Sequence, residues 1–350
     1  MPQDAHYRVY LGAYTGPESA ANGIRLAHAD GTGRLRCTDS VADSYDPSFL
    51  ALSPDGAALY AVNELARGRV VAFAVGADGR LTEVNSQPTH GSAPCHVSVH
   101  PSGRYVLTAN YLSGNVVVHP VGERGALREA CHAVEHSGQG PNRQRQEGPH
   151  AHQILPSPDG RFVLAADLGT DAVYVYAFDA DTGHMALKHE VSPQAGAGPR
   201  HLAFHPDGER AFLVNELDST IVPLAYDPET GELQPGRPRP LVPAGHTDEN
   251  LAAEVVVSPD GRFVFASNRG HDSIAVFTGE LEPLGFVPAG VRGPRHIALS
   301  PEGGVLYAAG QLSETVQAFE VSDSGELATL GDPVPTPAPA CVLPVPPRAE

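Results

Sequence analysis

The sequence PRHLAFHPDG at Pro199–Gly208 is one of six copies of a single pattern in this 350-residue chain. The copies are PSFLALSPDG (Pro47–Gly56), PCHVSVHPSG (Pro94–Gly103), AHQILPSPDG (Ala151–Gly160), PRHLAFHPDG itself, AAEVVVSPDG (Ala252–Gly261) and PRHIALSPEG (Pro294–Gly303). Their last glycines are 47, 57, 48, 53 and 42 residues apart. A repeat of about 40–50 residues is typical of a β-propeller blade.

Each copy predicts a β-hairpin. Apolar residues alternate before the turn, as at Leu202 and Phe204, which indicates a strand. In the turn, proline presets φ and glycine accepts a positive φ. A second apolar strand follows, as at residues 263–266, then a third, as at residues 172–178, and a weaker fourth. Four antiparallel strands in each repeat make a propeller blade.

The two ends of the chain together supply one more blade. Residues 8–14 (RVYLGAY) match a second strand without a first, and residues 339–344 (PACVLP) match a first strand without a turn. Pairing them closes the ring and removes exposed sheet edges. We therefore predict an all-β, seven-bladed β-propeller with four-stranded antiparallel blades. It forms one domain over residues 1–350, with residues 1–6 and 345–350 expected to be flexible.

Composition excludes several other classes. The chain has no Trp, which argues against a WD40 propeller, and its 33 Pro leave little room for the long helices of TIM or Rossmann folds. With 23 basic and 41 acidic residues, the net charge of −18 argues against nucleic-acid and anionic-membrane partners. A small anionic ligand held by a few arginines stays compatible with this charge. Oligomeric state is not indicated.

The sequence predicts a cytoplasmic protein. The first residues resemble no secretory signal, and no apolar run reaches the ~18 residues that span a bilayer. The four cysteines form no CxxC pair and match no zinc module. Scattered cysteines in a long chain are typical of free thiols in a reducing compartment.

Polar residues gather at one edge of the predicted blades. The start of each first strand and the end of each second strand lie at the same edge, and the first strands line the channel. That edge carries His96, His150, His152, Arg200, His201, Glu254, Arg295 and His296 from first strands, and Asn63, Glu64, Asn110, Asp167, Asn215, Glu216, Asn268 and Arg269 from second strands. Convergent polar groups at such a mouth predict a binding site. The opposite mouth receives the turns, whose His100 and His205 we expect to be structural.

Some of these residues have a simpler interpretation. Asn63, Asn110 and Asp167 can cap turns by bonding to nearby backbone. An arginine such as Arg200 needs an acceptor, which is either an acidic ligand or the neighbouring Glu216. His150 and His152 alone do not make a metal site, and no HExxH, GxSxG, P-loop or dinucleotide motif occurs. We therefore expect neither a metal nor a cofactor.

Two long insertions precede first strands on this edge. They are residues 136–149 and 245–250. Long loops in compact folds often carry function. We expect both to wall the site, with Arg143 and Arg145 as candidate anion contacts.

Four segments resemble one family over essentially the whole chain. They are GPHAHQ (Gly148–Gln153), GAGPRHLAFHPDG (Gly196–Gly208), VNEL (Val214–Leu217) and SNRGHDSIAVF (Ser267–Phe277). They resemble the lactonase family of seven-bladed propellers, which includes bacterial 6-phosphogluconolactonases and fungal 3-carboxy-cis,cis-muconate lactonizing enzymes. The resemblance implies catalytic roles for His152, Arg200, Glu216 and Arg269, although His150 could replace His152. A sugar-lactone hydrolase would belong to carbohydrate metabolism, in the pentose phosphate pathway.

The expected activity is hydrolysis of a sugar or phosphosugar lactone. His152 or Glu216 would take a proton from water, while Arg200 and Arg269 would hold the substrate anion and the developing oxyanion. The further candidate binding residues are His96, Asn110, His150, His201, Asn215, Asn268, Arg295, His296, Arg143 and Arg145. The alternatives are a carboxymuconate-type lactonizing cycloisomerase, which shares the proposed residues, and a ligand-binding propeller without turnover. The small aromatic content and the His, Arg and Glu at the rim favour an enzyme.

Overall fold

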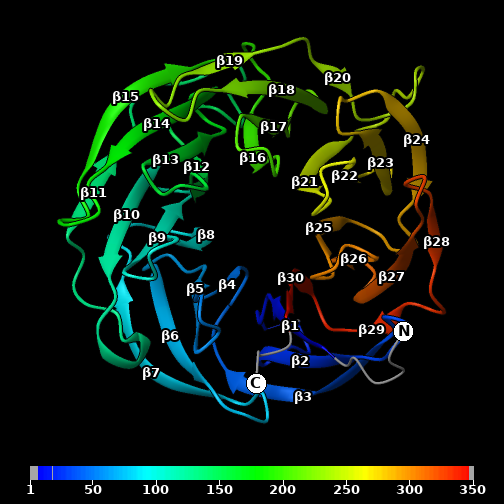
Figure 1. The fold of residues 1–350 in the computed structure, drawn as a ribbon, viewed down its shortest axis with the longest axis horizontal. Helices are drawn as coiled ribbons and strands as arrows, with labels where there is room; N and C mark the ends of the chain where they lie inside the picture. Colours follow the sequence, from blue (N-terminus) through cyan, green and yellow to red (C-terminus); the bar gives the residue numbers. More distant parts are fainter. Residues whose placement is uncertain (1–6, 18, 347–350) are drawn as a thin grey trace.

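The chain forms a ring of seven β-sheets around a central channel (Figure 1). The computed structural model describes residues 7–17 and 19–346. Each sheet lies like a blade, with its first strand at the channel and its last strand at the rim. The predicted seven-bladed, all-β propeller is confirmed.

The strands follow the predicted repeat. From the channel outward, one sheet contains β4 (Leu50–Leu52), β5 (Ala58–Asn63), β6 (Arg69–Val75) and β7 (Leu81–Pro88). The next sheet contains β8 (Pro94–Val99), β9 (Tyr105–Asn110), β10 (Asn115–Pro120) and β11 (His132–Glu135). The third contains β12 (Ala151–Pro156), β13 (Phe162–Asp167), β14 (Ala172–Phe178) and β15 (Met185–Val191). The fourth sheet contains β16 (Pro199–Phe204), β17 (Arg210–Asn215), β18 (Thr220–Tyr226) and β19 (Leu233–Pro235), with β20 (Arg239–Pro240) beside β18. The fifth contains β21 (Leu251–Val257), β22 (Phe263–Arg269), β23 (Ser273–Thr278) and β24 (Pro283–Pro288). The sixth contains β25 (Pro294–Leu299), β26 (Val305–Gly310), β27 (Thr315–Val321) and β28 (Leu327–Thr329), with β29 (Val334–Pro335) beside β27.

The seventh sheet joins the two ends of the chain. It contains β30 (Pro339–Val345), β1 (Tyr7–Ala13), β2 (Gly23–Ala29) and β3 (Leu35–Asp43). β30 pairs antiparallel with β1, so the C-terminal strand closes the ring as expected. Val345, within the segment expected to be flexible, pairs with Arg8. Residues 1–6 and 347–350 lie outside the described part of the chain.

The turns of the repeat lie at the edge opposite the predicted site, and they connect neighbouring blades. Gly208 has a φ of 74°, which glycine adopts at little cost. His100 Nε2 lies 2.8 Å from the Gly160 carbonyl oxygen of the next blade, and His205 Nε2 lies 3.0 Å from that of Gly261. These turn histidines are structural, as expected.

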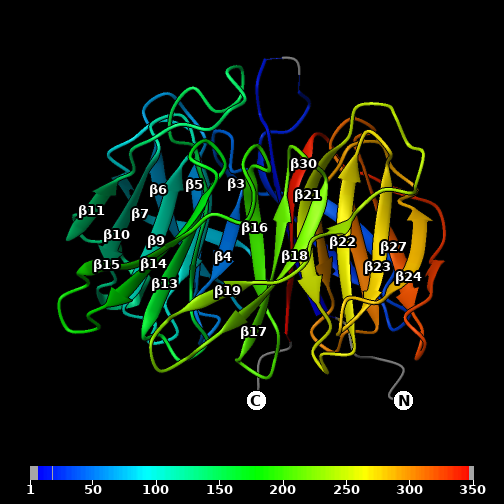
Figure 2. The same ribbon diagram turned by 90° about the horizontal axis from the view of Figure 1, so that it is seen from above.

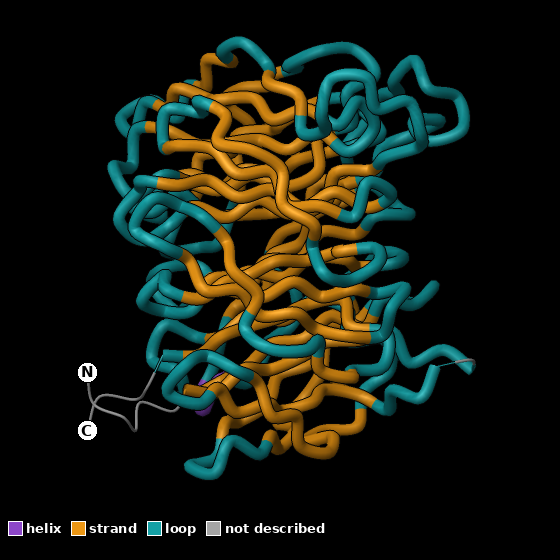
Figure 3. Tube along the Cα trace, turned by 90° about the vertical axis from the view of Figure 1, so that its right-hand side faces the viewer, coloured by secondary structure: helices purple, strands orange, loops and turns teal. Residues whose placement is uncertain are grey.

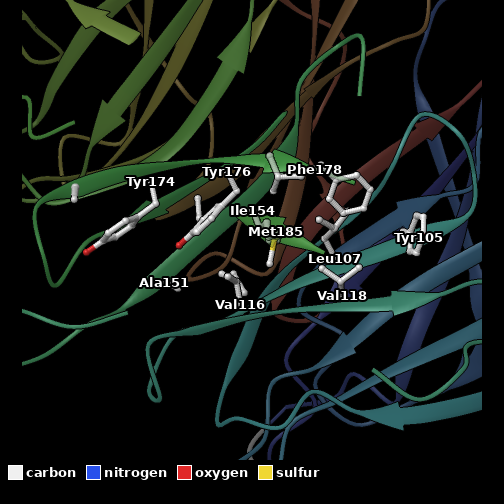
Figure 4. Close-up of a cluster of buried hydrophobic side chains, with 14 residues drawn as sticks. Tyr105, Leu107, Val116, Val118, Ala151, Ile154, Tyr174, Tyr176, Phe178 and Met185 are labelled. Atoms are coloured by element: carbon white, nitrogen blue, oxygen red, sulfur yellow. The ribbon is translucent and has the colours of Figure 1, made fainter. Parts of the chain in front are cut away.

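The core lies between the blades. Alternate residues of β14 point to one face, where Tyr174, Tyr176 and Phe178 pack with Val116 and others from the preceding blade (Figure 4). Full burial of one such apolar side chain contributes roughly 1.5–3 kcal/mol. Comparable clusters join the other blades, so each sheet is held by its neighbours on both faces.

Loops gather on the two edges of the ring, with strands running between them (Figure 3). Figure 2 shows the dark-blue loop after β1 at the edge where the second strands end. In the described part of the chain the helical content is one 3-10 turn, η1 (Glu123–Gly125), and no helix is long and apolar enough to cross a bilayer.

Candidate active site

Most first strands carry one extra residue at the predicted edge. In β8, Pro94 pairs with Asn110 and His96 pairs with Ala109, so Cys95 has no partner residue in β9. The same irregularity leaves His152 in β12, Arg200 in β16 and Arg295 in β25 without a partner residue in the neighbouring second strand. Such β-bulges re-aim a side chain and are frequent beside active sites.

These bulged side chains line two adjoining cavities at the mouth of the channel. The inner cavity, of about 10 Å³, is lined by Tyr14, Ser48, Phe49, Glu64, Cys95, His152, Arg200, His201, Glu254, Arg295, His296 and Ala340. The outer cavity, of about 220 Å³, is lined by Glu64, Cys95, Tyr111, Arg145, His152, Glu216, Leu251, Arg269 and Arg295. The inner one is about the size of one water molecule. Glu64, Cys95, His152 and Arg295 line both.

Three arginines converge on Glu216. Its Oε1 accepts a hydrogen bond from Arg145 Nη2 at 2.5 Å. Its Oε2 accepts from Arg200 Nε at 3.0 Å and from Arg269 Nη2 at 2.8 Å. Arg200 also donates to the Ala253 carbonyl oxygen, and this guanidinium is only 2% exposed. Glu216 is therefore the intramolecular acceptor that Arg200 requires.

This arrangement keeps Glu216 ionised. Burial alone would raise its pKa, but the charges of Arg269 and Arg200 and the bond from Arg145 outweigh burial and lower the pKa to about 2. Burial lowers the pKa of Arg269 to about 10 despite the charge of Glu216. A carboxylate held so firmly in its charged form is a weak base.

The loop that carries Arg145 is tied at both ends and in its middle. Asp167, at the end of β13, contacts His136 Nδ1 at 2.6 Å and accepts the His150 backbone N–H at 2.8 Å. Gln146 is buried and donates to the Leu168 carbonyl oxygen at 2.9 Å. These bonds fix residues 136–150 against the end of one blade, and so set Arg145 over the cavity.

A chain of hydrogen bonds leads from Glu254 to His152. His201 Nδ1 lies 2.9 Å from both carboxylate oxygens of Glu254, and His201 Nε2 lies 3.1 Å from His152 Nδ1. A carboxylate only accepts, so we assign the His201 proton to Nδ1. Nε2 of neutral His201 then accepts from His152 Nδ1–H. This leaves the lone pair of His152 on Nε2.

Other contacts support the carboxylate form of Glu254. His296 Nδ1 accepts the Val342 N–H, so neutral His296 carries its proton on Nε2, which lies 3.3 Å from Glu254 Oε2. The Val255 N–H also donates to Glu254. Burial raises the pKa of Glu254, while His296 and the charge of Arg200 oppose the rise. Three donors therefore surround this carboxylate.

His152 and His201, the two histidines in the chain of hydrogen bonds from Glu254, are both neutral. Burial lowers the pKa of His152 well below its ordinary value, and the charge of Arg200 lowers it further. Burial likewise lowers the pKa of His201, with Arg200 and Arg295 adding to the effect. A neutral imidazole with a free lone pair can accept a proton.

The structure brings together more than half of the predicted site residues. Those that line the two cavities are His152, Arg200, His201, Glu216, Arg269, Arg295, His296 and Arg145. They come from four blades and from the loop at residues 136–149, which contributes Arg145 to the wall of the outer cavity. Residues 246–251 line a further open pocket of about 500 Å³, which shares Arg145 and Leu251 with the outer cavity.

The asparagines predicted at this edge lie outside both cavities. Asn110 Nδ2 donates to the Thr89 carbonyl oxygen, and Asn268 Nδ2 donates to that of Leu241. Asn215 Nδ2 donates to the Thr220 hydroxyl. All three are fully buried, and their amides hold other segments of the chain at this edge.

Three basic candidates are also absent from both linings. His96 is buried, with its Nδ1 accepting the Ile154 N–H. His150 stacks on Tyr111, with ring centroids 4.6 Å apart, and its Nδ1 bonds to the Tyr111 carbonyl oxygen. Arg143 is exposed on its loop. Of the two histidines that could fill the catalytic role, His152 is the one that lines the cavities.

Tyr14, Tyr111 and Cys95 line the cavities, and sequence reasoning had not selected them. Their positions in the repeat could have revealed them. Tyr14 and Tyr111 directly follow second strands, as Glu64 and Glu216 do. Burial raises the pKa of the Cys95 thiol, which makes it a poor nucleophile.

No group of three or more His, Cys, Asp or Glu side chains in residues 7–17 and 19–346 is arranged to hold a metal ion. The cavities offer instead a neutral imidazole, several guanidinium groups and a carboxyl group, that of Glu64, at one junction. Such a set can bind an anion, activate water and stabilise an oxyanion.

Comparison with known proteins identifies relatives along nearly the whole chain. The chain is 35% identical over 345 residues to a 6-phosphogluconolactonase of Bacillus subtilis, covering 96% of this chain and 97% of that protein. It is 31% identical over 322 residues to a 6-phosphogluconolactonase of Pectobacterium carotovorum, covering 90% and 92%. A periplasmic gluconolactonase of Pseudomonas aeruginosa superposes with a TM-score of 0.91 at 31% identity, covering 97% and 99%.

Residues 8–344 match the family described as lactonase, 7-bladed beta-propeller. The match spans the closing strand, all seven blades and every residue of the two cavities. The ring, its bulged first strands and its relatives agree, and the chain belongs to the lactonase family of seven-bladed β-propellers.

Proposed function

We propose that this protein hydrolyses the lactone of a sugar acid, with 6-phosphogluconolactone as the leading substrate. The observation that carries the proposal is the position of His152, a neutral histidine at the junction of a water-sized cavity and a larger one. The names of the relatives, which are 6-phosphogluconolactonases and a gluconolactonase, support the same class of substrate.

His152 is the proposed general base. Water in the inner cavity gives its proton to His152 Nε2 and attacks the lactone carbonyl. The contact with His201 holds the opposite nitrogen and orients the ring. General-base catalysis of this kind contributes roughly 10²–10⁴-fold in rate. Glu216, the other base that the sequence allowed, is disfavoured because three arginines hold it ionised with a pKa of about 2.

The arginines divide between two roles. Arg269 and Arg295 line the outer cavity, where they can bind the substrate's anionic group and the oxyanion. Arg200 lines the inner cavity and fixes the Glu216 carboxylate, which in turn positions Arg145 and Arg269. One preorganised donor of this kind supplies about 3 kcal/mol of transition-state stabilisation.

The dimensions and charge of the cavities restrict the substrate. A volume of about 220 Å³ is below the ~300–1,000 Å³ of sites for drug-sized ligands, which suits a ligand of one-sugar size. The open pocket beyond it carries Asp218, Asp248 and Glu249. A phosphate is therefore expected on the inner side, near Arg145 and Arg269, because those carboxylates would repel it.

The test is an assay of the purified protein with 6-phosphogluconolactone, glucono-δ-lactone and a carboxymuconate, following proton release and subtracting spontaneous hydrolysis. We expect turnover of at least one sugar lactone, and no lactonization of the carboxymuconate. Folded protein that accelerates neither sugar lactone would refute the proposal. Turnover of the carboxymuconate alone would reassign the site to lactonizing chemistry.

We also propose that the protein works in the cytoplasm. All four cysteines lie in the described part of the chain and are unpaired, which is typical of a reducing compartment. The Pseudomonas relative is named as periplasmic, so fractionation of the native host with an antibody to this protein is the direct test. Signal in the periplasmic fraction would contradict the proposal.

A further inference from the structure

Glu64 differs from the other carboxylates of the two cavities. Glu216 is held by three arginines, and Glu254 contacts His201 and His296. Within the described residues, no arginine, lysine or histidine lies within ion-pair distance of Glu64. A carboxyl group that lines both cavities without a close ion pair is a candidate for acid–base chemistry.

The surroundings of Glu64 hold it in one place. It directly follows β5, and its Oε2 accepts a hydrogen bond from the Tyr14 hydroxyl at 2.9 Å. Tyr14 directly follows β1 in the neighbouring blade. The Arg295 guanidinium lies over the Tyr14 ring, 5.4 Å from its centroid. Glu64, Tyr14 and Arg295 therefore form one wall of the inner cavity.

Glu64 and His152 flank the same space from different blades. Cys95 of the blade between them lies with both in the lining of each cavity. In a lactone, the carbonyl carbon that water attacks and the ring oxygen that must leave are bonded to each other. A base at one wall and an acid at another can act on these two atoms together.

We propose that Glu64 is the general acid that protonates the ring oxygen of the lactone as the ring opens. The inference rests on the proposed lactone hydrolysis and adds a second catalytic residue to it. Tyr14 is a positioning residue, because it holds Oε2 of Glu64 and acts on the substrate only through that carboxyl group.

The reaction balances without any other participant. Water forms a bond from its oxygen to the carbonyl carbon and gives its proton to His152 Nε2. The tetrahedral intermediate then collapses, the bond from carbon to ring oxygen breaks, and the ring oxygen takes the proton of Glu64. The hydroxy acid leaves as its carboxylate plus a proton. The proton on His152 returns to Glu64 through solvent, and the enzyme is restored.

Burial is the main influence on the pKa of Glu64, and it raises this pKa above its ordinary value. The charge of Arg295 and the hydrogen bond from Tyr14 oppose the rise only in part. The charged and titratable groups around it are Arg295 and Tyr14 beside it, Asp46 in the loop before β4, and, around the two cavities, Cys95, His152, Arg200, His201, Glu254, His296, Arg145, Glu216 and Arg269. Asp46 raises the pKa further, by repulsion between carboxylates.

The first test compares leaving groups with the variant Glu64→Gln. An alkoxide leaving from glucono-δ-lactone needs a proton, whereas a phenolate leaving from dihydrocoumarin needs much less help. We expect kcat/KM to fall at least 100-fold for glucono-δ-lactone and less than fivefold for dihydrocoumarin, relative to the wild type. Glu302→Gln, the same change in an exposed turn on the opposite edge, is the control and should alter neither value. Equal losses on both lactones, or no loss on the sugar lactone, would overturn the proposal.

The second test uses the pH profile, which serves even if dihydrocoumarin is not turned over. In the wild type, kcat/KM should fall at high pH as Glu64 loses its proton, and Glu64→Gln should lack this fall. Tyr14→Phe removes a donor that favours the ionised carboxylate, so the alkaline limb should move to higher pH. An alkaline limb that is unchanged in both variants would overturn the role of Glu64.

The two proposals fail in different ways. Wild-type protein without activity on any sugar lactone would refute the proposed function. Wild-type activity together with a fully active Glu64→Gln would refute only the role of Glu64. Circular dichroism and a thermal melt of each variant separate loss of fold from loss of chemistry.

Discussion

Replacing Glu216 by Gln should reveal how much the arginine cluster depends on one carboxylate. Gln has nearly the same shape, but it carries no charge and offers an NH₂ group where an oxygen accepted hydrogen bonds. Arg145, Arg200 and Arg269 would then share a neutral acceptor in a site where Glu216 is 3% exposed. Breaking a buried ion pair by removing one partner costs about 3–5 kcal/mol.

The pKa of Glu216 gives a second estimate of how much this ionised carboxylate stabilises the folded protein. It lies at about 2 in the folded protein, against an ordinary value of 4.5, and this gap corresponds to about 3 kcal/mol of stabilisation. Because the folded-state pKa lies below the unfolded one, the stabilisation is complete above about pH 4.5. It is lost as the pH falls toward 2.

Urea denaturation of the wild type and Glu216→Gln from pH 7 to pH 3.5 measures this effect. The variant should be less stable by about 3 kcal/mol at pH 7. The difference should shrink below about pH 4.5, because Glu216 of the unfolded wild-type chain then takes up a proton while Glu216 of the folded protein stays ionised. Glu302→Gln, in an exposed turn, is the matched control and should stay within about 0.5 kcal/mol of the wild type. A difference below 1 kcal/mol at pH 7, or one that does not shrink in acid, would refute the reasoning.

Three further outcomes are expected. Glu254→Gln should lower kcat by roughly tenfold to a hundredfold with little change in KM, since it disturbs the orientation of the catalytic base without touching substrate; steady-state kinetics with an unchanged kcat would contradict this. Iodoacetamide at pH 7.5 should alkylate exposed Cys131 and leave buried Cys95 unmodified, with no loss of activity. Peptide mass spectrometry and the lactonase assay measure these two results. Labelling of Cys95 in the folded protein would contradict its burial. Deleting residues 339–350 removes β30 and opens the edge of β1, so the protein should lose cooperative unfolding and aggregate; a soluble monomer with a wild-type melt would contradict closure of the ring.

The repeat predicted the fold well, because each copy contains its own reasons for a hairpin. The alternation at Leu202 and Phe204 and the positive φ at Gly208 are local properties, and the structure has β16 and β17 on either side of that turn. Closure by residues 339–345 was also predictable, since an unpaired second strand at one end requires a first strand from elsewhere.

The site was predicted less completely, because a β-bulge changes which side chains face the channel. A regular strand would turn neighbouring residues to opposite faces, yet both Arg200 and His201 line the inner cavity. Counting eight positions back from the six turn glycines gives Ser48, Cys95, His152, Arg200, Ala253 and Arg295. Counting from the turns would therefore have found Cys95.

The partners of the arginines could not be read from the sequence. Arg145 reaches Glu216 across 71 positions of the chain, from a loop whose path depends on buried Gln146 and Asp167. Arg269 and Arg200 reach the same carboxylate from different blades. Such contacts depend on how the blades pack against one another, which a single-blade pattern does not contain.

The most direct test of the account is kcat/KM for 6-phosphogluconolactone, measured with the wild type and with His152→Gln under identical conditions. The account predicts clear acceleration by the wild type over spontaneous hydrolysis and a loss of about 100-fold or more in the folded variant, since general-base catalysis contributes ~10²–10⁴-fold. A folded His152→Gln protein within tenfold of the wild type would contradict the claim that this histidine activates water at the channel mouth.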